Sequence, residues 1–233
     1  MAPTSDNSAA AKTFLALQAL GVRDASGYLD ILKDCLSKIS VTYSPTYAPT
    51  YAPINSLFRE LTLNDGINFL ISHFLNNLQF TNKRLIVIGN GGSAAIALHS
   101  LVDFANAGGL KTVDLFSPSL LTCMANDYGY ENVFSKPIEI LAEKGDVLFA
   151  ISSSGQSPNI IKACESALAL KCLLVTFSGF SMDNPLRKLG HLNFYVPSTH
   201  YGFVELAHQA LLHCILDLFI RSKVYEKMRE TLG

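Results

Sequence analysis

Four serines lie on one turn in residues 150–157, which read AISSSGQS. The turn follows an apolar run and precedes a proline and a helical pattern, and one serine would be enough to cap that helix. Hydroxyl groups and free backbone N–H groups at the start of a helix suit an anion, and their number here suits a single phosphate monoester. A serine-rich loop without a ligand is the alternative. We expect the phosphate to bind Ser152, Ser153, Ser154 and Ser157.

A second turn of this kind occurs earlier in the chain and reads IGNGGSAA, over residues 88–95. Gly89, Gly91 and Ala94 fit the G-x-G-x-x-A pattern of dinucleotide-binding proteins, and Asp114 follows 20 residues after Ala94. Physically, the pattern indicates a tight turn that offers backbone N–H groups to an anion. Because the serine turn favours a monophosphate over a pyrophosphate, we treat dinucleotide binding as the weaker interpretation.

Side chains suited to proton transfer and metal binding lie in two helical segments. His99 and Asp103 are four residues apart, so they share one face of a helix. Glu205 and His213 lie on the last helical segment, and their eight-residue spacing corresponds to about 12 Å along a regular helix. One ion shared by both is therefore marginal unless the helix begins irregularly. The structural alternatives are an ordinary helix pair for the first two residues, a favourable first-turn acid for Glu205, a packed or interface residue for His208, and a packed core residue for His213.

Five short apolar runs, rich in β-branched and aromatic residues, indicate strands that are buried on both faces. They cover residues 84–89, 111–116, 146–152, 171–177 and 192–197. Helical patterns separate them at 92–107, 118–141, 157–170 and 183–189, and a last one covers 202–227. This alternation predicts an α/β fold with a parallel sheet and helices on both faces. In such sheets ligands bind outside the carboxyl ends of the strands, where both turns lie.

The first part of the chain has a different pattern. Apolar residues at helical spacing predict helices over 9–20, 25–39 and 55–79. Between the last two, YSPTYAPTYAP duplicates a Pro-Thr-Tyr-Ala unit, and its prolines exclude a continuous helix. We expect an extended surface connector there, with a proline-rich docking segment as the alternative. The chain then divides into a helical extension with this connector, residues 1–54, and a main domain, residues 55–233.

Composition restricts the classes of function. The formal net charge is −1, from 18 basic and 19 acidic residues, and no basic run stands out, so we expect no nucleic-acid partner. Polar residues interrupt every long apolar run, and the N-terminus lacks the pattern of a signal peptide, so we expect no membrane partner. Five scattered cysteines without a CxxC pair indicate free thiols in a reducing compartment. We therefore expect a cytoplasmic protein.

Three motifs, in order, resemble the SIS (sugar isomerase) domain family, and within it the phosphoheptose isomerase branch. They are GNGGSAAIALHS, ANDYGYENVFS at 125–135 and ISSSGQSPNIIKA at 151–163, and the resemblance covers roughly 55–225. It implies a three-layer, doubly wound, five-stranded parallel sheet with flavodoxin-like strand order, and a homotetramer. It also implies aldose–ketose isomerisation of sedoheptulose 7-phosphate to D-glycero-D-manno-heptose 7-phosphate through an enediol.

The resemblance also implies roles for individual residues. A divalent cation, which we expect to be zinc, would bind His99, Asp103, Glu205 and His213. Asp103 and His213 would be the catalytic base and acid, with Glu205 as the alternative base. The sugar phosphate would contact Glu205 and the three motifs through Asn90, Gly91, Gly92, Ser93, Asn126, Asp127, Ser152, Ser153, Ser154 and Ser157.

The chain departs from the family pattern at several positions. The family usually has glutamate where this chain has Asp103 and glutamine where it has Glu205, and the segments FSGFSMDN and STHYGFVEL also differ. The alternatives are therefore another sugar-phosphate enzyme, or a non-catalytic module that binds a sugar phosphate or a protein. The last helix is apolar on most sides, which predicts that it packs against another subunit and that each site draws residues from more than one chain.

Overall fold

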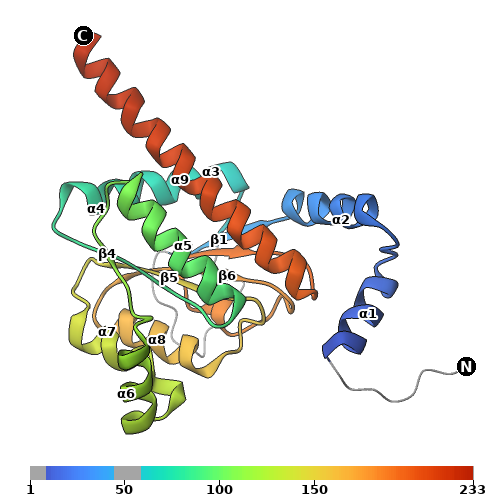
Figure 1. The fold of residues 1–233 in the computed structure, drawn as a ribbon. Coiled ribbons are helices and arrows are strands. Elements are labelled where there is room, and N and C mark those ends of the chain that lie inside the picture. The colour runs from blue at the N-terminus through green and yellow to red at the C-terminus, as the bar shows by residue number, and fades with distance from the viewer. Residues whose placement is uncertain (1–8, 45–58, 233) are drawn as a thin grey trace, which may run out of the picture.

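Figure 1 shows the fold in a computed structural model, which describes residues 9–44 and 59–232, with side chains over 13–44 and 59–224. Most of the duplicated Pro-Thr-Tyr-Ala segment falls between the two described ranges. The predicted connector, and the docking segment that is its alternative, therefore lie outside the described residues.

The centre of the fold is a seven-stranded sheet with the order β2-β1-β7-β6-β5-β3-β4. Five of these strands run parallel, and they are the five strands that the sequence predicts. Their order, β4-β3-β5-β6-β7, is the doubly wound, flavodoxin-like order, so the predicted fold class is confirmed. The five strands are β3 (Leu85–Ile88), β4 (Thr112–Val113), β5 (Val147–Ser152), β6 (Leu173–Ser178) and β7 (Leu192–Tyr195).

Two further strands extend the sheet beyond β7 and were not predicted. β1 (Ser40–Tyr43) pairs antiparallel with β7, and β2 (Arg59–Leu61) pairs antiparallel with β1. Both are too short to show a clear alternating pattern. The helix predicted over 55–79 is wrong at its start, because α3 begins at Leu63, where the Thr62 side chain accepts a hydrogen bond from the Asp65 N–H. The division of the chain at residue 54 stays a prediction, and β1 joins the main sheet.

Helices cover both faces of the sheet and complete three layers (Figure 1). One face carries α2 (Ala25–Ser37), α3 (Leu63–Leu70), a π-helical turn (Ile71–Leu75), α4 (Asn76–Phe80), α5 (Gly92–Asn106) and α9 (Tyr201–Leu232). The other carries α6 (Pro118–Tyr128), α7 (Ser135–Leu141) and α8 (Pro158–Ala169). Helix α1 (Ala9–Ala19) and the 3₁₀ turns Tyr130–Asn132 and Leu186–Lys188 complete the described helical elements.

Two predicted helices are shorter than expected. The pattern over 118–141 forms α6 and α7 with a break at Gly129, whose φ of 83° lies in the left-handed region that glycine adopts easily. The pattern over 183–189 forms only a 3₁₀ turn.

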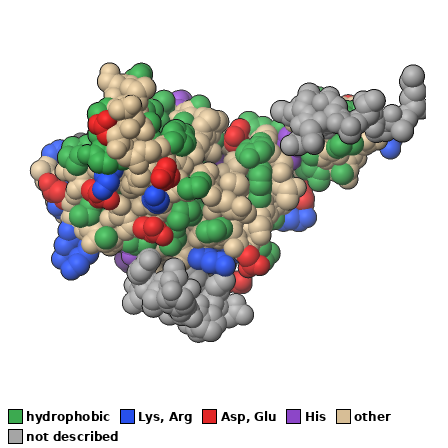
Figure 2. All heavy atoms as spheres, turned by 90° about the horizontal axis from the view of Figure 1, so that it is seen from below, with side chains coloured by type: hydrophobic (Ala, Val, Ile, Leu, Met, Phe, Trp, Pro, Cys, Tyr) green, Lys and Arg blue, Asp and Glu red, His purple; other side chains and the backbone are tan. Residues whose placement is uncertain are grey.

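Alternating side chains of the central strands supply both halves of the core. In β3, Leu85 and Val87 pack with α5 and α9, whereas Ile86 and Ile88 pack with α7 and α8. All four residues of β3 and all six residues of β5 are buried, as expected for strands covered on both faces. On the face shown in Figure 2, acidic and basic side chains are mixed among apolar ones rather than gathered by sign.

Helix α9 combines core packing with an apolar length that could cross a membrane. An 18-residue window within Tyr201–Val224 has a mean hydropathy of 1.5, but half of that window is buried inside the protein. A core helix meets such a test as readily as a membrane span does. The burial of Phe203, Val204, Leu211 and Phe219 against the sheet accounts for its composition.

One buried histidine fastens α9 to the end of β6. His208 is fully buried, and its Nε2 donates to the Ser178 carbonyl oxygen at 3.2 Å. Its ring also contacts the Phe177 ring edge-on. Burial lowers the pKa of His208 to about 4, because a charged imidazole would lose its hydration there. His208 is therefore a packed core residue, the structural alternative that the sequence leaves open.

This burial makes stability depend on pH. The unfolded chain binds a proton at an ordinary histidine pKa, whereas His208 in the folded chain binds one only near pH 4. The contribution of neutral His208 to the free energy of unfolding is present above about pH 6.5. It is lost as the pH falls toward 4, by about 3 kcal/mol in total. Urea unfolding of the wild type and of His208→Gln at pH 7 and pH 4.5 should show a smaller pH-dependent loss in the variant. An equal loss in both proteins would contradict this assignment.

Candidate active site

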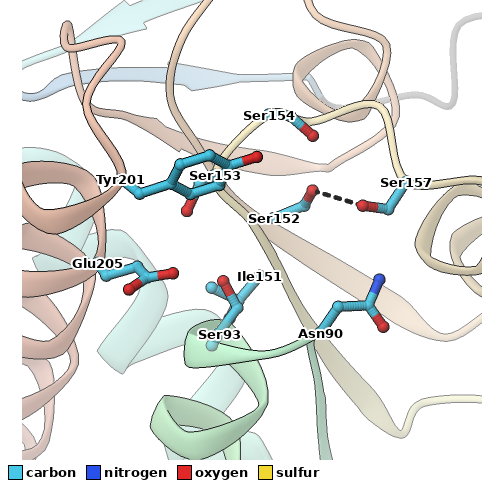
Figure 3. A pocket seen from close by; sticks show the side chains of 9 residues that line it. All are labelled: Asn90, Ser93, Ile151, Ser152, Ser153, Ser154, Ser157, Tyr201 and Glu205. Carbon is cyan, nitrogen blue, oxygen red and sulfur yellow. Dashed lines mark hydrogen bonds between the residues drawn. The ribbon is translucent and has the colours of Figure 1, made fainter. Parts of the chain in front are cut away.

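A polar pocket lies at the carboxyl ends of β3 and β5, beside the start of α9 (Figure 3). The cavity has a volume of about 120 Å³ and is open to solvent on one side. Seven of its lining residues are ones that the sequence predicts for substrate binding. Ile151 and Tyr201 are additional. The lining residues are Asn90, Ser93, Ile151, Ser152, Ser153, Ser154, Ser157, Tyr201 and Glu205.

The serine turn presents its hydroxyl groups to this pocket. Ser157 occupies the position that precedes α8, yet its side chain caps no helix N–H and instead lies 3.4 Å from the Ser152 hydroxyl. The Ser154 hydroxyl accepts a hydrogen bond from the Gln156 N–H. The Ser153 hydroxyl is buried and has no partner among the described residues. A buried hydroxyl without a partner is costly, so the Ser153 hydroxyl is available to hydrogen-bond a group bound in the pocket.

The glycine turn forms the adjoining wall and leaves room for a carboxylate. A side chain at Gly89 would collide with the Ser93 backbone, so glycine allows β3 to pass directly into α5. A side chain at Gly92 would collide with the Glu205 carboxylate, which lies against the first turn of α5. Two glycines of the motif therefore have steric reasons for their presence.

Glu205 is the acidic residue of this pocket. Its partial burial raises the pKa of the carboxyl group, because the charged form loses hydration. In Figure 3 the carboxylate points from α9 toward Ser93 and the space in front of the serine turn. A half-buried carboxyl group with a raised pKa is a candidate for proton transfer to or from a bound sugar.

A reciprocal amide pair joins the two turns. The Asn90 side chain donates to Asn159 Oδ1, and the Asn159 side chain donates to Asn90 Oδ1, both at 2.9 Å. Asn159 is buried in the first turn of α8, directly after the serine turn. The Tyr130 hydroxyl also donates to Asn90 Oδ1 at 3.3 Å. The pocket wall is thus held by side chains from three separate segments.

A buried asparagine, Asn184, packs against the serine turn. The Asn184 amide donates to the Ser178 hydroxyl, the Gly179 carbonyl and the Ser181 carbonyl. Its side chain fills the space beside Gly155, the residue in the serine turn whose φ is 64°. A larger residue at that glycine would both adopt a strained φ and collide with Asn184. The loop after β6 therefore shapes the turn after β5.

A second group of chemical side chains lies farther along α5 and α9. The Asp103 Oδ2 atom is 3.1 Å from His99 Nε2 and 3.7 Å from His213 Nδ1, and the two histidine Nε2 atoms are 3.3 Å apart. The ligand atoms all lie within 4.8 Å of one another. Two imidazoles and a carboxylate are a donor set that zinc and other transition metals accept. We call these three residues the His–Asp–His cluster.

Glu205 lies apart from this cluster within one chain. Helix α9 begins at Tyr201 in ordinary α-helical form, so the spacing of about 12 Å between Glu205 and His213 holds without the irregular start that the sequence leaves open. The geometry thus divides the four predicted metal ligands into the three of the cluster and one that lines the pocket.

The structure also separates Asn126 and Asp127 from the pocket lining. Both are exposed in the last turn of α6, where the Asn126 amide donates to Asp127 Oδ1. Their contact with a sugar stays a prediction. Among the residues that sequence analysis missed, Tyr201 shares a helix face with Glu205 four positions later, which is a signal that could have identified it. Asn184 carries no such signal, because its role depends on a tertiary contact.

Comparisons with known proteins agree with this geometry. A family model described as SIS domain matches residues 51–179, more than half of the chain. The phosphoheptose isomerase of Fusobacterium nucleatum is 34% identical over 152 residues, which are 63% of this chain and 78% of that relative.

Solved structures show the same likeness. The structure of phosphoheptose isomerase GmhA from Neisseria gonorrhoeae matches with a TM-score of 0.61 and 30% identity, over 67% of this chain and 86% of that chain. A phosphoheptose isomerase from Francisella tularensis matches with a TM-score of 0.62 and 25% identity, over the same shares.

The support that Asn184 gives to the serine turn leads to a prediction. Asn184→Ala should lower the free energy of unfolding by about 1–3 kcal/mol through lost buried hydrogen bonds, and should also weaken the binding of inorganic phosphate. Asn193→Ala is a matched control, because the buried Asn193 amide donates to the Gly190 and Thr42 carbonyls near the amino end of β7, away from the serine turn. Calorimetric titration should show weaker phosphate binding only in Asn184→Ala. Equal phosphate affinity in both variants would contradict the prediction.

Proposed function

The chain belongs to the SIS domain family and is a sugar-phosphate isomerase of the phosphoheptose isomerase kind, and on this premise we propose that it interconverts sedoheptulose 7-phosphate and D-glycero-D-manno-heptose 7-phosphate. The observation that carries the proposal is the serine turn, whose buried Ser153 hydroxyl lacks a protein partner inside a polar pocket. A phosphate oxygen supplies the missing acceptor. The relatives are named phosphoheptose isomerase, which supports a heptose phosphate as the substrate.

The phosphate binds where several donors meet. The hydroxyls of the serine turn line the pocket at the start of α8, and the positive end of the helix dipole favours an anion there. Asn90 and Ser93 of the glycine turn contact the sugar beyond the phosphate.

Within one chain, the pocket and the His–Asp–His cluster are well separated along α5 and α9. Ser93 and Asp103 are ten residues apart on α5, which corresponds to about 15 Å along the helix. Glu205 and His213 are separated by a comparable length of α9. A seven-carbon sugar phosphorylated at carbon 7 places its phosphate and its reacting carbons at opposite ends of the chain. The proposed site therefore combines the pocket of one chain with the cluster of a neighbouring chain.

The His–Asp–His cluster fits a divalent cation, and we propose zinc at His99, Asp103 and His213. When bound, such an ion polarises the carbonyl oxygen of the sugar and makes the neighbouring C–H more acidic. Glu205 of the same chain serves the pocket, and its predicted role as a ligand requires a neighbouring chain.

The chain's own residues then move the proton. Aldose–ketose isomerisation transfers a proton between adjacent carbons, so it needs a base and an acid. Asp103 takes the proton, and His99, 3.1 Å from the same carboxylate oxygen, orients it. His213 returns a proton as the acid, and its 3.7 Å separation from Asp103 lets both act on one substrate. Glu205, whose raised pKa favours the protonated form, donates to sugar hydroxyls in the pocket or acts as the alternative base.

We further propose a cytoplasmic homotetramer assembled through α5 and α9. Leu98, Val102 and Leu206 are exposed apolar residues on these two helices, beside the half-exposed histidines of the cluster. Exposed apolar side chains grouped on one face are typical of an interface. A neighbouring chain on this face brings its own cluster residues toward the serine pocket, so each site draws on more than one chain.

Binding and turnover should separate in variants. With a panel of C5 to C7 ketose phosphates, the wild type should form an aldose fastest from the C7 compound.

Ser154→Ala/Ser157→Ala should weaken substrate binding by about 1–3 kcal/mol, because charge-assisted hydrogen bonds are lost. Asp103→Asn should lower turnover by about 100-fold or more while phosphate binding survives, and Asp34→Asn, an exposed carboxylate on α2, is the control. Phosphate binding without turnover of any sugar would favour the non-catalytic alternative.

The assembly has its own test. Light scattering of the purified chain at micromolar concentration should give a mass near four times 25.4 kDa. Val102→Glu places a charge on the proposed interface and should lower the mass and the turnover together. A wild-type monomer with full activity would refute this part of the proposal.

A further inference from the structure

Tyr201 is the polar pocket residue that neither the sequence pattern nor the proposed reaction uses. It is the first residue of α9, and its ring lines the pocket opposite the serine turn. Figure 3 shows the ring extending from α9 across the pocket, with its hydroxyl group directed toward the serine turn. Glu205, one helical turn later, points into a different part of the same space.

The ring of Tyr201 packs against Phe180, a residue with a strained backbone conformation. Phe180 packs edge-on against it, with ring centroids 4.8 Å apart and an interplanar angle of 73°. The φ of Phe180 is 58°, in the left-handed region that bulky residues rarely adopt. A glycine would occupy this position without strain. Strained residues of this kind persist where the surroundings over-determine them, and they cluster at binding sites.

The surroundings of Phe180 do over-determine it. Its N–H donates to the Ser198 carbonyl at 2.8 Å, and its carbonyl accepts from the Tyr195 hydroxyl at 2.9 Å. The Tyr195 ring in turn lies under the Arg187 guanidinium, 4.7 Å from its centroid. Side chains of β7 and of the following loop thus fix the backbone that presents the Phe180 ring to Tyr201.

We propose that Tyr201 is a substrate-binding residue whose hydroxyl donates a hydrogen bond to the phosphate of the sugar phosphate, and that Phe180 is the positioning residue that holds it there. The proposal rests on the proposed function, because it needs a phosphate on the serine turn. A phenol is a donor that carries no negative charge, so it complements the serine hydroxyls on the opposite side of the anion. The start of α9 adds the positive end of a third helix dipole beside those of α5 and α8.

The phosphate, rather than the sugar, is the partner that the geometry favours. The hydroxyl of Tyr201 is directed toward the serine turn, whereas Glu205 and Ser93 line the part of the pocket that leads away from it. Glu205 therefore remains for the sugar hydroxyls, and Tyr201 closes the anion site. This pairing also keeps the carboxylate of Glu205 away from the phosphate charge.

The first experiment removes one oxygen atom. Tyr201→Phe keeps the ring and its contact with Phe180 but loses the hydroxyl, and calorimetric titration with inorganic phosphate should show affinity lower by about 10-fold or more. Tyr43→Phe is the matched control, because Tyr43 packs on Phe69 at the amino end of β7, far from the pocket. Its phosphate affinity should equal that of the wild type. Wild-type affinity in Tyr201→Phe would overturn the proposal.

The second experiment tests whether Phe180 acts through Tyr201. Phe180→Gly relieves the backbone strain but removes the supporting ring, so phosphate affinity should fall although the free energy of unfolding need not. In a Tyr201→Phe background, Phe180→Gly should cause little further loss, because the hydroxyl that it positions is already absent. Independent, additive losses would refute the positioning role.

Ser154→Ala/Ser157→Ala separates this inference from the proposed function. If the wild type binds no phosphate, the phosphate site of the proposed function falls and the inference falls with it. If the serine variant loses phosphate binding and Tyr201→Phe does not, the proposed function stands and the role of Tyr201 alone is wrong.

Discussion

The arrangement of the site depends on how two elements are fastened to the carboxyl end of β6. The Ser178 carbonyl accepts hydrogen bonds from the His208 ring and from the Val196 N–H, and the Ser178 hydroxyl accepts one from the Asn184 amide. The first bond ties α9 to the sheet, and the last ties down the loop that supports the serine turn. The side chains of Ser178, Asn184 and His208 are all buried, where hydrogen bonds are strong and an unsatisfied donor or acceptor is costly. The start of α9 and the serine turn form two walls of the pocket, and both are therefore positioned by hydrogen bonds to Ser178, the first through His208 and the second through Asn184.

This sharing explains why polar residues are retained deep in the core. Apolar side chains of similar volume could fill the same space, but they would not specify the direction of the turn or the rotation of the helix. Rotation of α9 decides which residues face the pocket, since Glu205 lines it while Leu206 faces outward. The stacked rings of Phe177 and Phe194 next to Ser178 supply the apolar packing, and the hydrogen bonds supply the orientation.

The parts of the structure that follow from local patterns could be predicted from the sequence. The five parallel strands are continuous apolar runs, and the serine turn is recognisable because four hydroxyls exceed what a helix cap needs. The strands β1 and β2 could not be predicted, because pairing with β7 stabilises segments of three and four residues that carry little pattern of their own. Asn184 and Phe180 were missed for a related reason: each matters through contacts with residues that are distant in sequence or on another element. The resemblance gave four metal ligands together, whereas the eight-residue spacing made one ion shared by Glu205 and His213 marginal, and the regular start of α9 leaves Glu205 apart from the other three.

Helix α9 also fixes the spacing between the pocket and the His–Asp–His cluster of one chain. Because Glu205 and His213 stand on the same rigid element, the span between the pocket and the cluster cannot vary continuously; it changes only in steps of about 1.5 Å, each with a rotation of about 100°. Only shifts of three or four residues return a side chain to the same face. A chain of this fold could therefore reposition its cluster relative to its own pocket only by moving the histidine a whole turn along α9, with a matching move on α5. Within one chain, intermediate separations between the pocket and the cluster are inaccessible.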